Sequence, residues 1–540
     1  MSGLSKRRIA EDSEIEKKFA QGQRLQSRDR FADAEARYRK VLAADPAHIG
    51  ALTGICQCLI AQERAPEAIE LLDHAAETIP ADPASLFELG TACTVIGYRH
   101  QARAVYRRAL ELNPDHTSVL INLANVENDL GETQNAVDLL SRAIEVNPNA
   151  ARAYSNLGKI LTGTSLVEEA LSCYLRAIEI DPRISQTWTN LAALYEIMGR
   201  FEDALEALRR SLTLNPECDA ARWNLARTLL TLGQVEAGWD MYGFGFACRE
   251  RKPYRPFPGL IWAGEDIKDK TIMVWREQGL GDDLIFSTCY SDLIARAGHV
   301  IIETDARLVP LYQRTWPQAT VRAETLASTG LGNYGEVDFD LTAPAGLVAA
   351  QLRRNLDAFP DHIEGLQPDP ERVAACRDWL ATLGPGPKVG IAWTSAKVND
   401  LRAPNYTALA DWIPLFKAQN VSVVNLQYTN VDEEAEALAR EHGLTLHRMP
   451  DLDLFGDLEG AAALTACMDA VVGPSSFPLM LGSALGRPCF HYGQARIWTK
   501  LGTDGLPWFP TMRCYTIDRS TDRAALAARI TGDVTKFLAG

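Results

Sequence analysis

Residues 117–150 read TSVLINLANVENDLGETQNAVDLLSRAIEVNPNA, one copy of a unit that recurs along the first part of the chain. The proline near the end of this copy belongs to a series with a constant spacing of 34 residues: Pro46, Pro80, Pro114, Pro148, Pro182 and Pro216. Twelve residues before each proline stands an alanine: Ala34, Ala68, Ala102, Ala136, Ala170 and Ala204. Because proline ends a helix and a small side chain lets two helices approach closely, the period predicts a stack of helix pairs.

A third column supplies one large apolar side chain per unit: Tyr38, Leu72, Tyr106, Leu140, Tyr174 and Leu208. The period is typical of tetratricopeptide repeats (TPR), whose helix pairs stack into an α superhelix that holds another protein. We expect an N-terminal tail at residues 1–14 and the superhelix at residues 15–234, with six repeats and a degenerate seventh. The seventh begins near Asp219, and in it Gly238 replaces the alanine and Glu250 the proline.

One polar column is not explained by packing: Asn122, Asn156, Asn190 and Asn224. These residues are expected on the first helix of each pair, facing the concave side. Four amides there offer donors and acceptors to the backbone of an extended client protein, which makes them candidate acceptor-binding residues. The alternative is a ladder that caps neighbouring turns within the array. The column resembles the asparagine ladder of the O-GlcNAc transferase superhelix.

The composition narrows the class of protein. The 540 residues carry a formal net charge of −15, which argues against nucleic acid as the main partner. The start of the chain is charged, and no apolar stretch is long enough to cross a bilayer, so we expect neither a secretory signal nor a membrane span. The eleven cysteines are scattered and do not cluster with histidines, which predicts reduced thiols in a cytoplasmic protein and no zinc site.

Residues 235–268 are expected to form an aromatic-rich connector that caps the end of the helical stack. The connector contains a basic run: Arg249, Arg251, Lys252 and Arg255. This run is either a solvated face or the border of a site for an anionic ligand, and the sequence leaves both readings open.

Beyond Lys268 the chain alternates between strand and helix patterns. Strands are expected at 271–276, 300–304 and 337–341, and, after a break near residues 360–370, at 388–393, 421–427, 470–473 and 488–492. Helices are expected at 284–297, 372–383, 406–418 and 432–442. The alternation predicts an α/β region of parallel β-α-β units in two Rossmann-like lobes, residues 269–364 and 365–540. Ligands of such sheets bind at the carboxyl ends of the strands.

The first candidate motif follows the first of these strands and reads Glu277-Gln278-Gly279-Leu280-Gly281-Asp282-Asp283. Gly279 and Gly281 permit a tight turn and the close approach of a substrate. We expect the next helix to begin at or after Asp282, whose carboxylate is placed to accept a proton from an attacking hydroxyl. Asp283 is the second catalytic candidate. The alternative is a helix N-cap without chemistry.

The second motif is the polar loop after strand 388–393. Thr394, Ser395, Lys397 and Arg402 combine hydroxyls with two cations, as a nucleotide-sugar donor requires. The alternative is a solvated loop with ordinary charges.

The third motif is the turn Gly473-Pro474-Ser475-Ser476 before an apolar helix. Hydroxyls at a helix N-terminus make an anion site, which places Ser475 and Ser476 among the donor-binding candidates. The alternative is simple capping by either serine. Further along, His491, Trp498, Lys500 and Trp508 either shape the cleft or pack in the core.

Because of these three motifs, residues 238–518 resemble bacterial TPR-linked glycosyltransferases of GT-B type, which are related to heptosyltransferases and more distantly to O-GlcNAc transferases. The resemblance implies two Rossmann-like GT-B lobes and no metal or other cofactor. It also implies that Asp282 is the catalytic base, that Lys397 and Arg402 contact phosphate, and that Ser475 and Ser476 form the donor-phosphate turn.

A TPR array joined to such a region looks most like flagellin-modifying glycosyltransferases of the FlmG type. The resemblance implies that the array captures flagellin and that a nonulosonic acid, such as pseudaminic acid, is transferred from a CMP-activated donor to Ser or Thr, in support of the bacterial flagellum and motility. Two alternatives remain: transfer from a UDP- or ADP-sugar to another protein, a lipid or a polysaccharide, and a TPR scaffold whose transferase region has decayed.

Overall fold

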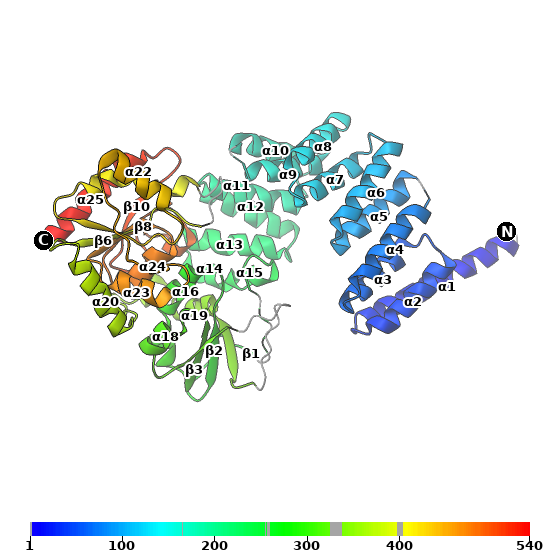
Figure 1. Ribbon diagram of the computed structural model, residues 1–540. Helices are drawn as coiled ribbons and strands as arrows, with labels where there is room; N and C mark the ends of the chain where they lie inside the picture. The colour runs from blue at the N-terminus through cyan, green and yellow to red at the C-terminus, as the bar shows by residue number, and fades with distance from the viewer. Residues whose placement is uncertain are drawn as a thin grey trace. The chain divides into compact units, whose positions relative to one another are not determined.

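A computed structural model describes residues 3–80, 82–164, 166–253, 255, 257, 260–324, 337–396 and 403–540 (Figure 1). The chain divides into two compact units, Met1–Asn190 and Leu191–Gly540.

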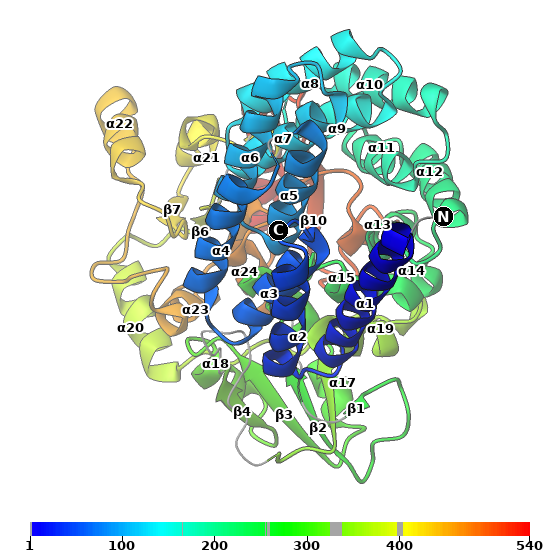
Figure 2. The same ribbon diagram turned by 90° about the vertical axis from the view of Figure 1, so that its right-hand side faces the viewer.

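The first unit consists of helix pairs that follow the predicted repeats. Its helices are α1 (Gly3–Gln26), α2 (Phe31–Ala44), α3 (Ile49–Ala61), α4 (Ala65–Thr78), α5 (Pro83–Ile96), α6 (Arg99–Leu112), α7 (Thr117–Asp129), α8 (Thr133–Val146), α9 (Ala151–Thr162), α10 (Val167–Ile180) and the start of α11 (Ser185–Ile197), up to Asn190. In Figure 2 these helices follow one another from blue to cyan as a winding stack. The expected superhelix of TPR pairs is confirmed. The predicted tail at residues 1–14 is helical from Gly3 onward, because its alanine, lysine, arginine and glutamate residues favour a helix without an apolar stripe.

The packing columns lie in the core as predicted. Every alanine of the column is fully buried, and so are the alternating tyrosines and leucines, for example Tyr106 and Leu140. The alternation has a partner column on the first helices that was not predicted. Gly22, Gly90 and Gly158 stand opposite the tyrosine rings, and a Cβ at each would lie closer than 3.0 Å to a ring atom. Cys56 and Ala124 take the corresponding positions in the leucine repeats.

The second unit opens with the last helix pairs. These helices are α12 (Phe201–Leu214), α13 (Asp219–Thr231), α14 (Val235–Tyr242) and the short α15 (Phe244–Ala247). Helices α13 and α14 are the two members of the seventh pair, so the predicted boundary at residue 234 is wrong: it cuts this pair in two. A Cβ at Gly238 would lie 2.6 Å from Leu230 Cγ, which explains why glycine replaces the alanine.

The seventh pair shares its core with the α/β region. Trp239 packs edge-on against Trp498 and Trp508, with ring centroids 6.4 and 6.3 Å apart. Its indole Nε1 donates to the carbonyl of Arg353 at 2.9 Å. The connector aromatics were expected only to cap the helical stack. They also join the last repeat to the sheets in one continuous core.

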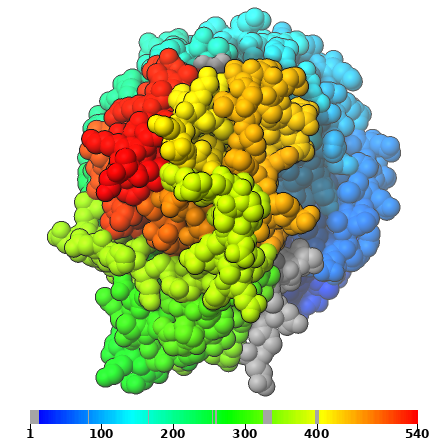
Figure 3. Space-filling view, turned by 60° about the vertical axis from the view of Figure 1, so that its left-hand side comes forward, coloured from blue at the N-terminus to red at the C-terminus, as the bar shows by residue number. Residues whose placement is uncertain are grey.

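Two five-stranded sheets, each wholly parallel, form the rest of the unit. The first has the order β1-β5-β2-β3-β4 and the second β10-β9-β8-β6-β7. The first sheet contains β1 (Leu260–Ile261), β2 (Thr271–Trp275), β3 (His299–Thr304), β4 (Thr320–Ala323) and β5 (Leu341–Pro344). The second contains β6 (Lys388–Ile391), β7 (Ser422–Asn425), β8 (Ala470–Pro474), β9 (Cys489–Gly493) and β10 (Arg513–Thr516). The predicted pair of parallel sheets is confirmed, and Figure 3 shows the two lobes against each other, the first in green below and the second in yellow to red above.

Several boundaries differ from the predictions. The strand expected at 337–341 starts only at Leu341, and strands β1, β4 and β10 were not predicted, because they are short edge strands without a long apolar run. The connector thus contributes β1 to the first sheet. The helix expected at 284–297 is two helices, and the segment 406–418 holds a short 3-10 helix (Leu409–Trp412) followed by the short α21 (Ile413–Phe416).

The helices that flank the sheets complete the unit. They are α16 (Leu280–Ser287), α17 (Tyr290–Ile294), α18 (Val309–Thr315), α19 (Ala345–Leu352), α20 (Pro370–Ala381), α22 (Asp432–His442), α23 (Leu458–Ala466), α24 (Phe477–Ala484) and α25 (Arg523–Ala539), with 3-10 turns at Leu356–Ala358, Ala403–Asn405, Leu409–Trp412 and Trp498–Lys500. Among the helices of the described residues, we find none whose length and apolar character would let it cross a lipid bilayer.

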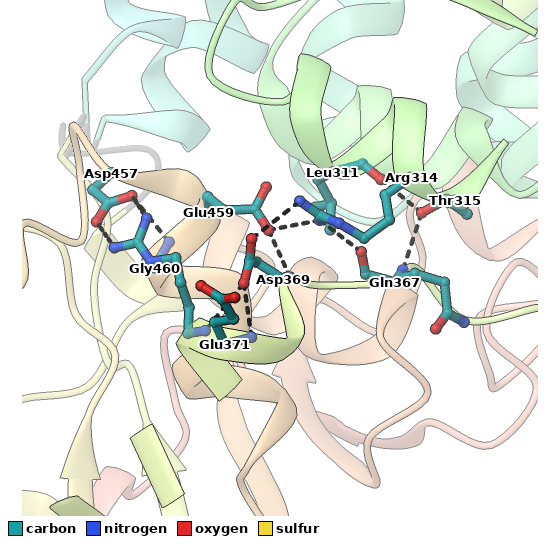
Figure 4. Close-up of polar contacts among 10 residues, drawn as sticks. Leu311, Arg314, Thr315, Gln367, Asp369, Glu371, Asp457, Glu459 and Gly460 are labelled. Carbon is teal, nitrogen blue, oxygen red and sulfur yellow. Dashed lines mark hydrogen bonds and ion pairs between the residues drawn. The ribbon is translucent and has the colours of Figure 1, made fainter. Parts of the chain in front are cut away.

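A polar cluster joins the two lobes where the chain passes from one sheet to the other (Figure 4). Arg314 of α18 donates to Glu459 of α23 at 2.8 Å and to the carbonyl of Gln367 at 3.0 Å. The same Glu459 oxygen accepts from the backbone N–H of Asp369 at 2.8 Å. Glu459 therefore ties both the first lobe and the connecting segment to the second lobe.

Candidate active site

A cleft of about 620 Å³ lies between the two lobes of the second unit. Its walls come from the segments that follow strands β2, β3, β6, β7 and β8, so the carboxyl edges of both sheets face it. Binding sites of parallel α/β sheets lie at this edge. The three predicted motifs are brought together here, since Asp282, Ser395, Ser475 and Ser476 all line the cleft.

Asp282 lies in the first turn of helix α16. That helix begins at Leu280, two residues earlier than predicted, with Gly279 as the N-cap residue. Asp282 Oδ2 accepts the backbone N–H of Gly279 at 3.1 Å, so the carboxylate caps the helix. The capping alternative is therefore realised, and the same half-buried carboxylate also lines the cleft. A carboxylate has two oxygens and several lone pairs, so capping does not exhaust its capacity to accept.

The two glycines of this turn are not required by its backbone. Neither Gly279 nor Gly281 has a positive φ; the left-handed residue is Gln278, with φ of 59°. A Cβ at Gly281 would find its nearest protein atom, Met480 Cγ, at 3.8 Å, an ordinary contact. The expectation that the glycines make the turn tight is wrong. Gly281 lines the cleft, and the lack of a side chain there lets a ligand approach the backbone closely.

Asp283 does not reach the cleft. Its side chain is fully buried and accepts hydrogen bonds from Thr304 Oγ1 at 2.5 Å and Tyr290 OH at 3.4 Å. Burial raises its pKa to about 6, partly offset by Thr304 and by the cation of Arg276. Asp283 holds helix α16 to strand β3, and a carboxylate buried in this way cannot reach a substrate in the cleft, which argues against Asp283 as a catalytic residue. It differs from its neighbour Asp282 because consecutive residues of a helix point in different directions.

The loop after β6 contributes one predicted hydroxyl to the cleft. Ser395 lines it, with Oγ 3.2 Å from Tyr428 OH. The Thr394 backbone N–H donates to Gln427 Oε1 at 3.2 Å, and Thr394 is not among the described lining residues. Lys397 and Arg402 lie outside the described residues, so their phosphate-binding role stays a prediction.

Neither of the two serines after β8, Ser475 and Ser476, caps helix α24 with its hydroxyl. Ser475 Oγ lies 2.6 Å from His491 Nε2. Ser476 is the N-cap residue of α24, yet its hydroxyl makes no capping hydrogen bond. That hydroxyl is buried and has no hydrogen-bond partner. The capping alternative is therefore wrong for both serines. A helix start without a side-chain cap leaves first-turn N–H groups for an anion, although Pro478 in this turn has no N–H to offer.

His491 contacts the cleft residue Ser475 from the core side. From the sequence, His491 was expected either to shape the cleft or to pack in the core. It is fully buried on β9. Burial, and then the neighbouring cation of Lys500, lower its pKa to about 3, so the ring is neutral near pH 7. A neutral imidazole can orient the Ser475 hydroxyl through Nε2. No short sequence motif marks this pair, because Ser475 and His491 come from neighbouring strands.

Arg307 is a cleft residue that sequence reasoning missed. Among the described residues that line the cleft it is the only cation. Arg307 Nε is held by Asp305 Oδ1 at 2.8 Å, and Nη1 donates to the Phe455 carbonyl of the other lobe at 2.7 Å. Its place just after a predicted strand, 300–304, was the available signal.

The asparagine column lies on the first helices of pairs, as predicted, and all four side chains are half-buried. Asn122 Nδ2 donates to Tyr106 OH at 3.2 Å, Asn156 Nδ2 donates to Asn125 Oδ1 at 3.0 Å, and Asn190 Oδ1 accepts from Gln186 at 2.9 Å. Part of the column thus binds within the array. Because an amide carries two donors and an acceptor oxygen, each keeps capacity for a client, and its acceptor-binding role stays a prediction.

Protein-family models match the repeats. Models described as tetratricopeptide repeat or TPR repeat match residues 25–87, 83–116, 124–163, 151–184 and 185–218. A thermophilic tetratricopeptide-repeat protein of Thermus thermophilus, TTC0263, is 22% identical, with a TM-score of 0.29; the match covers 31% of this chain and 90% of that one.

Two curated relatives add to this. Protein FlbA of Caulobacter vibrioides is 36% identical over 54% of this chain and 51% of its own length. The SPINDLY protein of Hordeum vulgare, named as a probable UDP-N-acetylglucosamine–peptide N-acetylglucosaminyltransferase, is 33% identical over 20% of this chain and 11% of its own length. The chain thus spans about half of one curated relative and about a tenth of the other. It carries TPR repeats and has a partial similarity to a named glycosyltransferase.

Proposed function

We propose that this protein is an O-glycosyltransferase that holds flagellin with its TPR array and transfers a nonulosonic acid of the pseudaminic-acid type to Ser or Thr. The observation that carries the proposal is the cleft, where a carboxylate on α16 of one lobe faces an uncapped helix start and two hydroxyls on the other. The partial similarity to SPINDLY, whose name describes sugar transfer to a peptide, supports the same class of reaction.

We further propose a GT-B architecture for the second unit. Two parallel sheets with a cleft at their carboxyl edges support this assignment. In such an arrangement the donor binds mainly to the second lobe and the acceptor approaches from the first. We also propose a cytoplasmic location, which the eleven unpaired cysteines support.

In the proposed reaction the Ser or Thr oxygen of the client attacks the anomeric carbon of the donor sugar. The bond from that carbon to the nucleotide phosphate breaks, and CMP leaves with the electron pair. Asp282 accepts the hydroxyl proton, because a neutral hydroxyl is a poor nucleophile near pH 7. The fixed N–H groups at the start of α24 stabilise the charge that grows on the leaving phosphate, at no cost of reorganisation.

The donor class follows from charge. A CMP-nonulosonic acid carries a phosphate and a carboxylate, so its site needs two groups that bind an anion. The start of α24 with Ser475 and Ser476 supplies one. Arg307 is proposed to supply the other, although Asp305 pairs with its guanidinium through both carboxylate oxygens. Lys397 and Arg402 are proposed to contact the phosphate as well, and their replacement by Ala is expected to weaken donor binding.

Intact mass of flagellin tests the proposal. Purified protein is incubated with flagellin and, separately, with a CMP-nonulosonic acid, UDP-N-acetylglucosamine or an ADP-heptose. We expect a mass increase of one nonulosonic acid residue or a multiple, and only with the CMP donor. An increase with the UDP donor would replace the proposed donor by the one in the SPINDLY name. No transfer from any donor, with flagellin still bound, would favour the scaffold alternative.

A further inference from the structure

A second cavity, of about 910 Å³, lies in the first lobe and shares no described lining residue with the cleft. We call it the connector cavity. Its described lining residues are Gly243, Phe246, Ala247, Arg249, Arg251, Lys252, Arg255, Phe257, Ile261, Trp275, Thr342, Pro344 and Leu347. Most of them belong to the basic and aromatic connector, whose role the proposed function leaves open.

The two faces of the first sheet are covered differently. One face carries Ile272, Val274 and Ile302, which join the main core with the flanking helices. The other face carries Met273, Trp275 and Ile301, which form a small separate cluster with Phe339 and the connector residues Phe246 and Phe257. Among the described residues this face is covered by that aromatic cluster, and the connector cavity lies against it.

The charge around the cavity is one-sided. Four of its described lining residues are cations and none is a carboxylate, in a chain whose net charge is −15. Arg251 is neutralised by buried Glu277 and stacks on the rings of Tyr242 and Phe246, each 4.0 Å away. Arg249 and Lys252 are exposed and form no ion pair with any described residue. The lining therefore keeps positive charge that the protein does not neutralise.

Several residues of the lining carry a buried polar atom that lacks a hydrogen-bond partner. Arg255 is 2% exposed; its Nη2 donates to Glu303 at 2.6 Å, but its Nε and Nη1 have no hydrogen-bond partner. Trp275 Nε1 and Thr342 Oγ1 are also buried without a partner. Leaving such groups unpaired costs free energy, most of all for a charged guanidinium, and native proteins seldom tolerate three in one place.

We propose that the connector cavity is a binding site for a small organic anion, a phosphate or a carboxylate attached to an aromatic body. The anion accepts from Arg255, Trp275 and Thr342 and is drawn in by Arg249 and Lys252. Its ring packs against Phe246 and Phe257. The site is independent of the cleft and of the sugar transfer proposed there.

Isothermal titration calorimetry of the full chain with phenyl phosphate tests the site. We expect binding of one molecule per chain, tighter than that of inorganic phosphate or phenol, each of which offers only half of the recognised chemistry. Phenylacetate runs in parallel, and the tighter of the two aromatic anions identifies phosphate or carboxylate as the recognised group. Undetectable binding of both aromatic anions at millimolar concentration would overturn the proposal.

Variants locate the binding. Trp275→Phe keeps an aromatic ring and removes a donor, and Thr342→Val removes the unpartnered hydroxyl at nearly constant volume. Each is expected to weaken binding by about tenfold or more, as the loss of a hydrogen bond to a charged group does. Thr342→Val should not lower the melting temperature of the free protein, because the removed hydroxyl has no partner there. Trp275→Phe should lower it modestly, because the smaller ring leaves part of a buried aromatic cluster unfilled, so for this variant the affinity is the readout. Arg255→Met should abolish binding, and Glu303 keeps Arg322 as a partner at 2.8 Å in that variant.

The matched control is Arg307→Met, which removes a cation from the cleft. It should leave the affinity for the aromatic anion unchanged. If Arg307→Met weakens binding as much as Trp275→Phe does, the anion binds in the cleft and the proposal fails. It also fails if Trp275→Phe and Thr342→Val lower the melting temperature but leave the affinity as in the unchanged protein.

Discussion

The two units of this protein use their side chains in opposite ways. In the first unit the same position recurs, so that Tyr38, Tyr106 and Tyr174 each fill the space opposite a glycine. In the cleft of the second unit nothing recurs: Asp282 and Arg307 each occur once, and each comes from a different strand end. Changes in the first unit should therefore act in graded steps on stability or binding, whereas one change in the cleft should stop the chemistry.

The sharpest test of this contrast is Asp282→Asn. The amide oxygen can still accept the Gly279 N–H, but the side chain no longer accepts a proton. We expect a loss of sugar transfer of about 10²–10⁴-fold, with flagellin still bound by the repeats. Transfer is followed by intact mass, and binding by pull-down. Near-normal transfer by a folded variant would exclude Asp282 as the base.

The graded side of the contrast is tested by replacing Asn122, Asn156, Asn190 and Asn224 together with Ala. Each lost hydrogen bond to the client should weaken capture by about 0.5–1.5 kcal/mol, without changing transfer to client already bound. Three of the amides also bind within the array, so we expect a modest fall in melting temperature. Asn135→Ala, on the second helix of a pair, is the control. A large fall in melting temperature with full client affinity would assign the column to structure alone.

A buried carboxylate of the second unit should make its stability depend on pH. Asp283 has a pKa of about 6 in the folded protein and an ordinary value of 3.8 when unfolded. Because the folded value is higher, its stabilisation is complete below pH 4 and is lost as the pH rises through 6. Asp283→Asn lacks this loss. Its stability relative to the unchanged protein should rise between pH 4 and 6 by roughly 3 kcal/mol, then level off.

Chemical denaturation across that pH range measures the difference. Glu127 of the first unit is the comparison, since it is also buried but is paired with Arg103 and Arg107. Glu127→Gln should destabilise the protein at pH 7, where Asp283→Asn should not. A pH-independent difference between Asp283→Asn and the unchanged protein would refute the assigned titration.

A smaller effect is expected from Gly90→Ala. The new Cβ would press into the ring of Tyr106, and overpacking of this kind costs about 1–3 kcal/mol. Gly532→Ala is the matched control, because nothing lies within 4 Å of its added Cβ in α25. It should stabilise the protein by about 0.5–1 kcal/mol. Equal effects of the two variants on the melting temperature would contradict the proposed packing.

The smallest expected effect is that of Ser476→Ala. The hydroxyl has no partner in the protein, so its removal should not lower stability. If it binds the donor phosphate, KM for the donor should rise by about tenfold or more, with little change in kcat. Ser483→Ala in the same helix is the control, because Ser483 Oγ bonds the Leu479 carbonyl at 3.1 Å and lies outside the cleft. An unchanged KM in Ser476→Ala would remove Ser476 from the donor site.

Much of this architecture could be predicted from the sequence. The proline and alanine columns located six helix pairs, and apolar runs located the central strands such as β2 and β8. The same reasoning missed the short edge strand β4 and cut the seventh pair at residue 234. It also kept Asp283 as a second catalytic candidate after Asp282, because two adjacent acidic residues before an apolar helix look alike until the helix register is known.

By itself, the sequence determined that this chain begins as a TPR stack and continues as parallel β-α-β units, because both patterns arise from neighbours along the chain. Only the tertiary structure decided which side chains share a surface. It turned Asp282 to the cleft and Asp283 to the core, left Ser476 unpaired, and gathered Arg255, Trp275 and Thr342 around one cavity. The physical reason is that burial and hydrogen-bond partners come from distant segments, as with Trp239 and Arg353, 114 residues apart.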